Sequence, residues 1–183
     1  IKLKKEIITF TNEKLFVEKN TAKFVKPNNW NRLIENKKVY LIDIRNDYES
    51  NIGTFKNAKK VNSKNFTEFK KYVKYNLTNM KSKKIAMFCT GGIRCEKASS
   101  YMKKIGFKNL YQLKGGILRY LETIPQNKSK WTGDCFLFDN RVSVKNEMKK
   151  GSYELCYGCR MPINKKNKLS PKFEEGVSCE YCF

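Results

Sequence analysis

The strongest chemical signal in this chain is a short glycine-containing segment framed by a cysteine and an arginine. Its residues are Cys89, Thr90, Gly91, Gly92, Ile93 and Arg94. An apolar run over 84–88 predicts a buried strand before it, and the residues over 95–105 predict a helix after it. Cys89 is therefore expected on a turn where backbone N–H groups and the positive end of a helix dipole converge. Those groups and Arg94 favour the thiolate, so the sequence predicts a nucleophilic cysteine in an anion-binding loop.

The length of this loop narrows the chemistry. Four residues separate Cys89 from Arg94, one fewer than cysteine phosphatases use to surround a phosphate. The shorter loop suits a persulfide or another small group, and the two glycines are expected to let the backbone curl around the sulfur. A buried structural cysteine at a strand end is the alternative, but it leaves the glycines and the arginine without a purpose.

Four further cysteines near the end of the chain have the spacing of a metal site. They form two Cys-x-x-Cys pairs separated by 19 residues, and they are Cys156, Cys159, Cys179 and Cys182. Four thiolates suit tetrahedral Zn²⁺, so a structural zinc is predicted, with free or redox-active dithiols as the alternative. The segment has few large apolar residues, and we expect it to need the metal in order to fold. Structural disulfides are not expected, because the sequence has no secretory signal.

Composition excludes several kinds of active site. The chain contains no histidine, which removes Ser-His-Asp and Cys-His catalysis and His-ligated metals. It also has no motif for an organic cofactor. The formal net charge of +22 fits either a polyanionic partner or a compositional bias toward lysine and asparagine. No apolar run could span a membrane and no signal peptide is evident, so a cytoplasmic protein without membrane contact is expected.

The elements that position these residues predict an α/β fold. Strands are expected over 39–45, 84–88 and 109–113, helices over 66–77, 95–105 and 117–121, β-like runs at 6–10 and 23–25, and a hairpin over 135–144. Strands that alternate with helices indicate a mostly parallel sheet flanked by helices. Three parts are predicted: an incoming linker over 1–25, the α/β domain over 26–125, and a hairpin with a Cys-rich module over 126–183.

Two signatures in the chain resemble those of rhodanese domains. Residues 41–45 with Glu49 and residues 53–58 resemble the first signature, although Thr54 stands where many rhodaneses have histidine. The Cys89 loop and residues 113–117 resemble the second. More narrowly, residues 89–98, Phe136, residues 139–141 and the paired Cys-x-x-Cys tail resemble the bacterial rhodanese-domain tRNA uridine hydroxylases, over nearly the whole chain.

This resemblance implies a rhodanese-like fold with a small four-cysteine module like a zinc ribbon. It also implies an enzyme that uses O2 to convert the wobble uridine of tRNA to 5-hydroxyuridine. Cys89 would be the active cysteine, residues 90–94 its cradle, and Asp43 and Arg45 its braces from the neighbouring strand. Cys95 would be a supporting thiol or a partner for disulfide or polysulfide formation, and simple packing is its alternative. The family usually has a small N-terminal α/β domain, so residues 1–25 are expected to be the end of one.

Two other functions stay open from the residues. A sulfurtransferase would hold the outer sulfur of a donor as a persulfide on Cys89 and pass it to an acceptor. A non-catalytic rhodanese-like module would dock on tRNA or protein, and it would not need Cys89. The sequence contains no flavin motif, haem ligand pair or non-haem iron triad that would activate oxygen.

Overall fold

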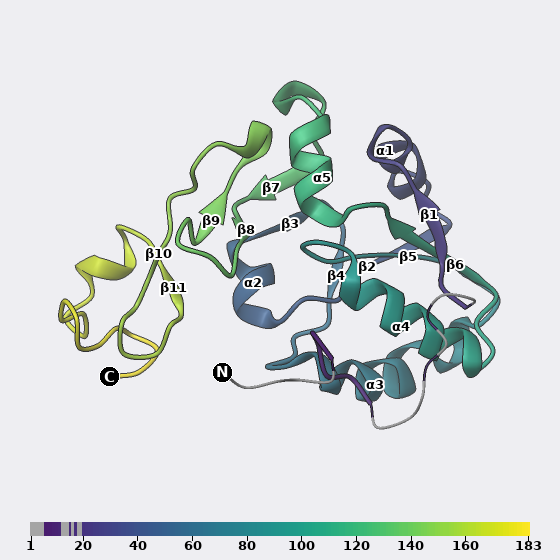
Figure 1. The fold of residues 1–183 in the computed structure, drawn as a ribbon, viewed down its shortest axis with the longest axis horizontal. Helices are drawn as coiled ribbons and strands as arrows, with labels where there is room; N and C mark the ends of the chain where they lie inside the picture. The colour runs from purple at the N-terminus through teal and green to yellow at the C-terminus, as the bar shows by residue number, and fades with distance from the viewer. Residues whose placement is uncertain (1–5, 12–14, 16, 18–19) are drawn as a thin grey trace.

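The core of the protein is a five-stranded parallel sheet. The computed structural model describes residues 6–11, 15, 17 and 20–183. The strand order is β1-β6-β5-β2-β4, and every neighbouring pair is parallel (Figure 1). The strands are β1 (Lys23–Val25), β2 (Val39–Asp43), β4 (Lys59–Lys60), β5 (Lys84–Phe88) and β6 (Asn109–Leu113). The predicted α/β fold with a mostly parallel sheet is confirmed.

Helices cover both faces of this sheet. They are α1 (Pro27–Ile34), α2 (Asp47–Ile52), α3 (Phe69–Tyr72), α4 (Ile93–Lys104) and α5 (Gly116–Thr123). Helices α3 and α4 lie on one side and α1 and α5 on the other (Figure 1). Strand β5 serves both cores, because Ile85 and Met87 pack under α3 and α4 while Ala86 and Phe88 pack under α1 and α5. A strand buried on both faces has a continuous apolar sequence, which is why β5 was predictable.

The helix predicted over 66–77 is divided into three kinds of turn. A 3-10 turn over Phe66–Glu68 leads into α3, and a π-helical segment over Val73–Leu77 follows it. The predicted apolar face is nevertheless buried, including Phe69 and Leu77. Apolar residues three or four positions apart stay on one side of the segment in all three kinds of turn, so the same face is buried.

Three short two-stranded sheets complete the structure. They are β3 (Gly53–Phe55) with β7 (Trp131–Gly133), β8 (Cys135–Phe136) with β9 (Ser143–Val144), and β10 (Glu154–Leu155) with β11 (Pro162–Ile163). The predicted hairpin is present as β8 and β9. Its Cys135 and Val144 join the α1–α5 core, as does Trp131, so the α/β core continues beyond residue 126.

The beginning of the chain differs from expectation in two places. Strand β1 pairs with β6, so the parallel sheet begins within the segment predicted as a linker over 1–25. Residues 6–10 form no strand in the structure, although Phe10 is buried against Phe66. Residues 1–5, 12–14, 16, 18 and 19 of the predicted linker lie outside the described residues. Within the described ranges, the helices are all too short or too polar to cross a bilayer.

Candidate functional site

Cys89 lies in the turn between the end of β5 and the start of α4. The residue is only 2% exposed, and the Gly92 N–H donates a hydrogen bond to its Sγ over 3.1 Å. Gly92 has a φ of 101°, in the left-handed region that favours glycine. The Gly92 N–H thus points at the sulfur, and the left-handed residue leads directly into α4.

The surroundings of Cys89 stabilise its thiolate. Burial alone raises the pKa of this thiol, but three other effects outweigh it and lower the pKa to about 6. They are a hydrogen bond with the Cys95 side chain, the charge of Arg94, and hydrogen bonds from the N–H groups of Cys95 and Gly92. Cys89 is therefore largely ionised at neutral pH, in the form that acts as a nucleophile.

The other two buried thiols of this domain have the opposite character. Burial, the hydrogen bond to Cys89 and the charge of that neighbour raise the pKa of Cys95 well above its ordinary value. Cys95 thus remains a thiol that can donate a hydrogen bond to the Cys89 thiolate. Burial also raises the pKa of Cys135 to about 12, partly offset by the charge of Arg45, so Cys135 is an inert thiol.

The Arg94 side chain is held by Glu49, which the sequence analysis did not assign to the site. Both carboxylate oxygens of Glu49 accept from the guanidinium, at 2.5 and 2.7 Å, and both residues are buried. The Thr90 hydroxyl also accepts from Arg94 and donates to Glu49. Arg94 therefore braces the loop through a bidentate ion pair, and its charge acts on the Cys89 thiolate from that fixed position.

Asp43 and Arg45 brace the other end of the same network. Arg45 donates to both carboxylate oxygens of Asp43 and to the carbonyl oxygens of Glu49 and Gly53. The hydroxyl of Thr54 donates to Asp43 over 2.8 Å. These contacts place Asp43 and Arg45 behind Glu49. Their support reaches the Cys89 loop through Glu49 and Arg94.

Helix α5 supports the loop from its other side. The N–H groups of Ile117 and Leu118 donate to the carbonyl oxygens of Cys89 and Thr90. A Cβ on Gly116 would lie 2.4 Å from the Thr90 carbonyl oxygen, so only glycine allows this approach. A Cβ on Gly91 would meet no atom within 4 Å. The expectation that both loop glycines are needed to curl the backbone therefore holds at Gly92 and is wrong at Gly91, whose missing side chain leaves open space.

A cleft of about 500 Å³ opens beside the Cys89 loop. Its walls are mostly apolar and include Ile8, Phe66, Ile93, Leu118 and Phe138. Phe138 is 70% exposed and also lines a second cleft of about 400 Å³ that extends to Cys159 and Arg160. The cleft beside Cys89 is large enough for a planar ring, and its apolar walls would exclude water from the sulfur.

The four late cysteines converge as the sequence predicted. All four Sγ atoms lie within 4.8 Å of one another, with 3.6 Å between Cys159 and Cys179 and 3.9 Å between Cys156 and Cys182. Four sulfurs at about 2.3 Å from a tetrahedral zinc would be separated by roughly 3.8 Å. The cysteines form no disulfides. This cluster could therefore hold a metal ion such as zinc.

Comparison with known proteins places the parallel sheet and its loop in a known group. A family model described as the rhodanese-like domain matches residues 27–123. A rhodanese-like domain protein from Staphylococcus aureus is 26% identical with a TM-score of 0.44, over 54% of this chain and 90% of that chain. The Alr3790 protein from Anabaena is 17% identical with a TM-score of 0.49, over 60% of this chain and 91% of that chain. A rhodanese-related protein from Thermoplasma volcanium is 20% identical with a TM-score of 0.44, over 55% of this chain and 91% of that chain.

Proposed function

Because this chain belongs to the rhodanese-like domain family, we propose that it is a cysteine-dependent tRNA-modifying enzyme that hydroxylates the wobble uridine at C5, with O2 as co-substrate. The observation that carries this proposal is the pairing of a low-pKa Cys89 with a large apolar cleft. Membership of the family supports cysteine-based chemistry in general. The finer assignment draws on the resemblance of the loop, the hairpin and the Cys-rich tail to the tRNA uridine hydroxylases.

The dimensions of the cleft favour a nucleobase over a small sulfur donor. A thiosulfate-sized anion needs little more than the loop itself, whereas the cleft extends over about 500 Å³ with mostly apolar walls. Phe138 is positioned at its rim with most of its ring exposed. An exposed aromatic ring provides a stacking surface that any base can use. These features suit a uracil ring laid over the Cys89 loop.

The Cys89 thiolate has a chemical role to play at that ring. A thiolate that adds to C6 of uracil makes C5 electron-rich, and C5 is the carbon that gains oxygen. One atom of O2 enters C5 and the other leaves as water, while two external thiols supply two electrons and two protons and become a disulfide. Departure of the Cys89 thiolate from C6 and loss of the C5 proton restore the double bond. The loop N–H of Gly92 holds the sulfur in its anionic form before addition and after release.

The Cys-rich module contributes binding in this proposal. Its four thiolates would hold a zinc ion that fixes the two knuckles, and Tyr157 and Tyr181 then stand exposed on them. A zinc ion there supplies structure, because four protein ligands leave it no open position for substrate. The second cleft connects this module with Phe138, so a single-stranded segment of tRNA could lie across both.

Sulfur transfer is the second candidate, and one observation favours it. The short loop presents the Gly92 N–H directly to the sulfur, the contact that a terminal persulfide would need. In that reaction the Cys89 thiolate attacks the outer sulfur of a donor such as thiosulfate, the donor S–S bond breaks and sulfite leaves. An acceptor nucleophile then takes the outer sulfur of the persulfide and releases the Cys89 thiolate. Thiosulfate turnover that depends on Cys89, without a modified tRNA, would favour this candidate.

The deciding experiment uses tRNA from cells that lack the endogenous protein. The cells are complemented with wild type or Cys89→Ser, and the digested nucleosides are analysed by mass spectrometry. We expect 5-hydroxyuridine or its derivatives with wild type and none with Cys89→Ser. Cys135→Ser is the matched control, since it changes another buried thiol outside the loop and should retain the product. Unchanged uridine in all strains would contradict the hydroxylase and direct attention to sulfur transfer.

A further inference from the structure

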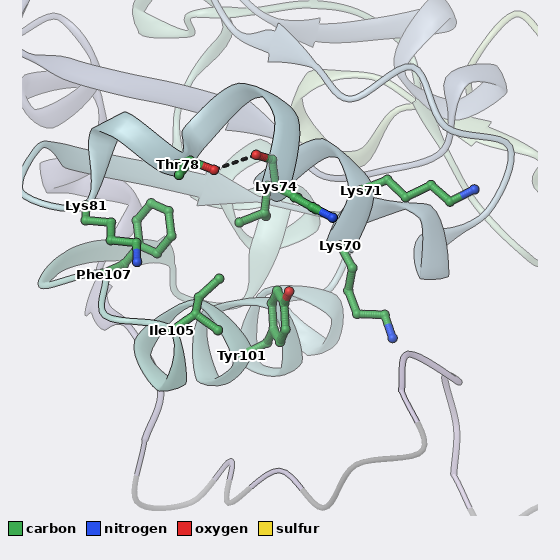
Figure 2. A pocket seen from close by; sticks show the side chains of 9 residues that line it. Lys70, Lys71, Lys74, Thr78, Lys81, Tyr101, Ile105 and Phe107 are labelled. Carbon is green, nitrogen blue, oxygen red and sulfur yellow. Dashed lines mark hydrogen bonds between the residues drawn. The ribbon is translucent and has the colours of Figure 1, made fainter.

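A groove lined by lysines lies between residues 70–81, which contain part of α3 and the turns after it, and the end of α4. It is distinct from the cleft beside Cys89. It has a volume of about 290 Å³. Its lysines are Lys70, Lys71, Lys74 and Lys81. Its apolar lining is formed by Val73, Tyr101, Ile105 and Phe107. Figure 2 shows Tyr101 of α4 and Ile105, which directly follows α4, extending toward the helical segment that carries the lysines.

The positive charge of this groove has no counter-charge among the described residues. Among the residues that the structure describes, no acidic side chain lines the groove. Within the same ranges, none of its four lysines forms an ion pair with a carboxylate. The Lys70 Nζ lies 6.0 Å from the ring centroid of Phe10, and this cation–π contact does not neutralise the charge of the lysine. Four cations gathered in this way attract a polyanion.

The groove and the Cys89 cleft lie on the same face of the sheet, separated by the buried ring of Phe10. Phe66 lines that cleft and Tyr101 lines the groove, and Phe10 lies between them, with ring centroids 4.5 Å from Phe66 and 5.7 Å from Tyr101. Along α4, the positions from Tyr101 to Ile105 are roughly 10–17 Å from Arg94 at 1.5 Å per residue. A small anion bound at Cys89 could not reach these lysines. An extended polyanion with one residue at Cys89 could reach them.

We infer that this lysine groove binds the phosphodiester backbone of an RNA substrate whose reactive base occupies the Cys89 cleft. The inference rests on the proposed function and adds the surface that holds the rest of the substrate. RNA fits the groove better than an acidic peptide, because the exposed part of Tyr101 offers ring surface to a ribose or base beside the cations. The groove residues also present no strand edge on which a peptide could add.

The test compares two variants that lose the same charge. The groove variant is Lys70→Gln, Lys71→Gln, Lys74→Gln and Lys81→Gln combined. The control variant is Lys26→Gln, Lys37→Gln, Lys38→Gln and Lys128→Gln combined, four exposed lysines around α1 on the opposite side of the sheet. Binding of unmodified tRNA to the 183-residue chain is measured by fluorescence anisotropy between about 50 and 200 mM salt. The alkylation rate of Cys89 checks that both variants are folded.

We expect the groove variant to bind tRNA at least about tenfold more weakly at about 100 mM salt, with the slope of log K against log salt reduced by about 3. The control variant should lose less than about threefold, with a slope change below about 1. Equal losses in the two variants would overturn the inference. So would a groove variant that keeps tRNA affinity but loses binding of polyglutamate, because the groove would then belong to an acidic protein.

The outcome separates this inference from the proposed function. If the groove variant loses tRNA binding while wild type forms no 5-hydroxyuridine, the groove stands and the hydroxylation fails. If wild type forms 5-hydroxyuridine and the groove and control variants do so with equal KM, the hydroxylation stands and the groove inference is wrong. A KM for tRNA that rises only in the groove variant, with kcat unchanged, supports both.

Discussion

Two groups of cysteines in this chain are positioned by different means. The Cys89 loop is held by the parallel sheet, with β5 behind it, α4 after it and the N–H groups of α5 on its carbonyls. The Cys-rich module has only a small core, in which Ile163 and Phe173 accompany the cysteines themselves. Four thiols within 4.8 Å of one another need a common partner to stay together. The parallel sheet and its helices position the Cys89 thiolate, whereas a bound metal ion would stabilise the fold of the Cys-rich module.

The two regions also differ in what stabilises their thiolates. At Cys89 a single thiolate is stabilised by N–H groups, the Cys95 thiol and the charge of Arg94. In the module, by contrast, four thiolates would repel one another without a cation between them. We therefore expect loss of the metal ion to unfold the Cys-rich module, and loss of the contacts around Cys89 to change the stability of its loop and the pKa of its thiol. Each effect can be measured separately.

Removal of metal should unfold the Cys-rich module and leave the Cys89 loop intact. Structural zinc binding contributes on the order of 10 kcal/mol to folding of small Cys-ligated modules. We expect one zinc per chain by elemental analysis, and loss of amide exchange protection over 156–182 after chelation or in Cys179→Ser. The alkylation rate of Cys89 should change less than about twofold. A large change in that rate on chelation would mean that the two regions are coupled.

The substitution Glu49→Gln should destabilise the Cys89 region, because it leaves the Arg94 guanidinium buried without its counter-charge. Breaking a buried ion pair in this way lowers the free energy of unfolding by about 3–5 kcal/mol. The control is Glu122→Gln, which removes a carboxylate from the exposed pair with Arg119 and should cost less than about 1 kcal/mol. Urea denaturation of the two variants compares them directly, and similar midpoints would show that the Glu49 pair is not structural.

The pH dependence of Cys89 should reveal the role of Cys95. Alkylation of Cys89 in wild type should have a midpoint at about pH 6, its pKa in the fold. We expect Cys95→Ala, which removes the hydrogen-bond donor, to raise that midpoint by about one unit, equivalent to about 1.4 kcal/mol. Cys95→Ser retains a donor and should stay near wild type. Identical midpoints in both variants would assign the lowered pKa to the backbone and Arg94 alone.

The same lowered pKa predicts a trend in stability. In the unfolded chain the thiol titrates near its ordinary value of 9.0, so the folded state has lost a proton that the unfolded state retains between about pH 6 and 9. The contribution of Cys89 to the free energy of unfolding is therefore complete above about pH 9 and is lost as the pH falls through about 6. Urea denaturation of Cys89→Ala across this interval should show the slope removed, and an unchanged slope would mean that other groups cause it.

Gly91→Ala should change stability least of all. A Cβ there meets no atom within 4 Å, so we expect a change in the free energy of unfolding within about 0.5 kcal/mol. Because Gly91 lines the cleft, the added methyl group should take space from the substrate, so activity should fall while the pKa of Cys89 stays at about 6. Gly116→Ala is the contrast, since its Cβ would collide with the Thr90 carbonyl oxygen and should disrupt the loop. A stable and active Gly116→Ala would contradict this role of α5.

Much of this molecule follows from local sequence patterns. The strands over 84–88 and 109–113 have the bounds that the sequence predicts. In the first of them, burial on both faces leaves a nearly continuous apolar run. The loop that carries Cys89 is predictable because a strand end, two glycines and a helix start lie within about ten residues. The convergence of the four late cysteines is predictable from their spacing, since each Cys-x-x-Cys pair forms its own turn.

Local sequence patterns do not predict contacts between distant parts of the chain. Glu49 holds Arg94 across 45 residues, and the sequence contains only one weak hint of it, the position of Glu49 in the first signature. The pairing of β1 with β6 was missed because β1 has only three residues, too few to show a period. The pitch changes after α3 were missed because 3-10, α and π turns keep nearly the same apolar face.

The sequence by itself determined which residues could act. They are the Cys89 thiol on a strand-to-helix turn and a cluster of four cysteines that could hold a metal ion, each specified by residues close together in the chain. Only the tertiary structure decided what acts on them. It made Cys95 the hydrogen-bond donor to Cys89, Glu49 the anchor of Arg94 and Gly116 the neighbour of Thr90, and it brought Phe138 to the cleft. The reason is physical: spacing along the chain sets local conformation, whereas the pKa of a thiol and the walls of a cleft depend on which elements pack together.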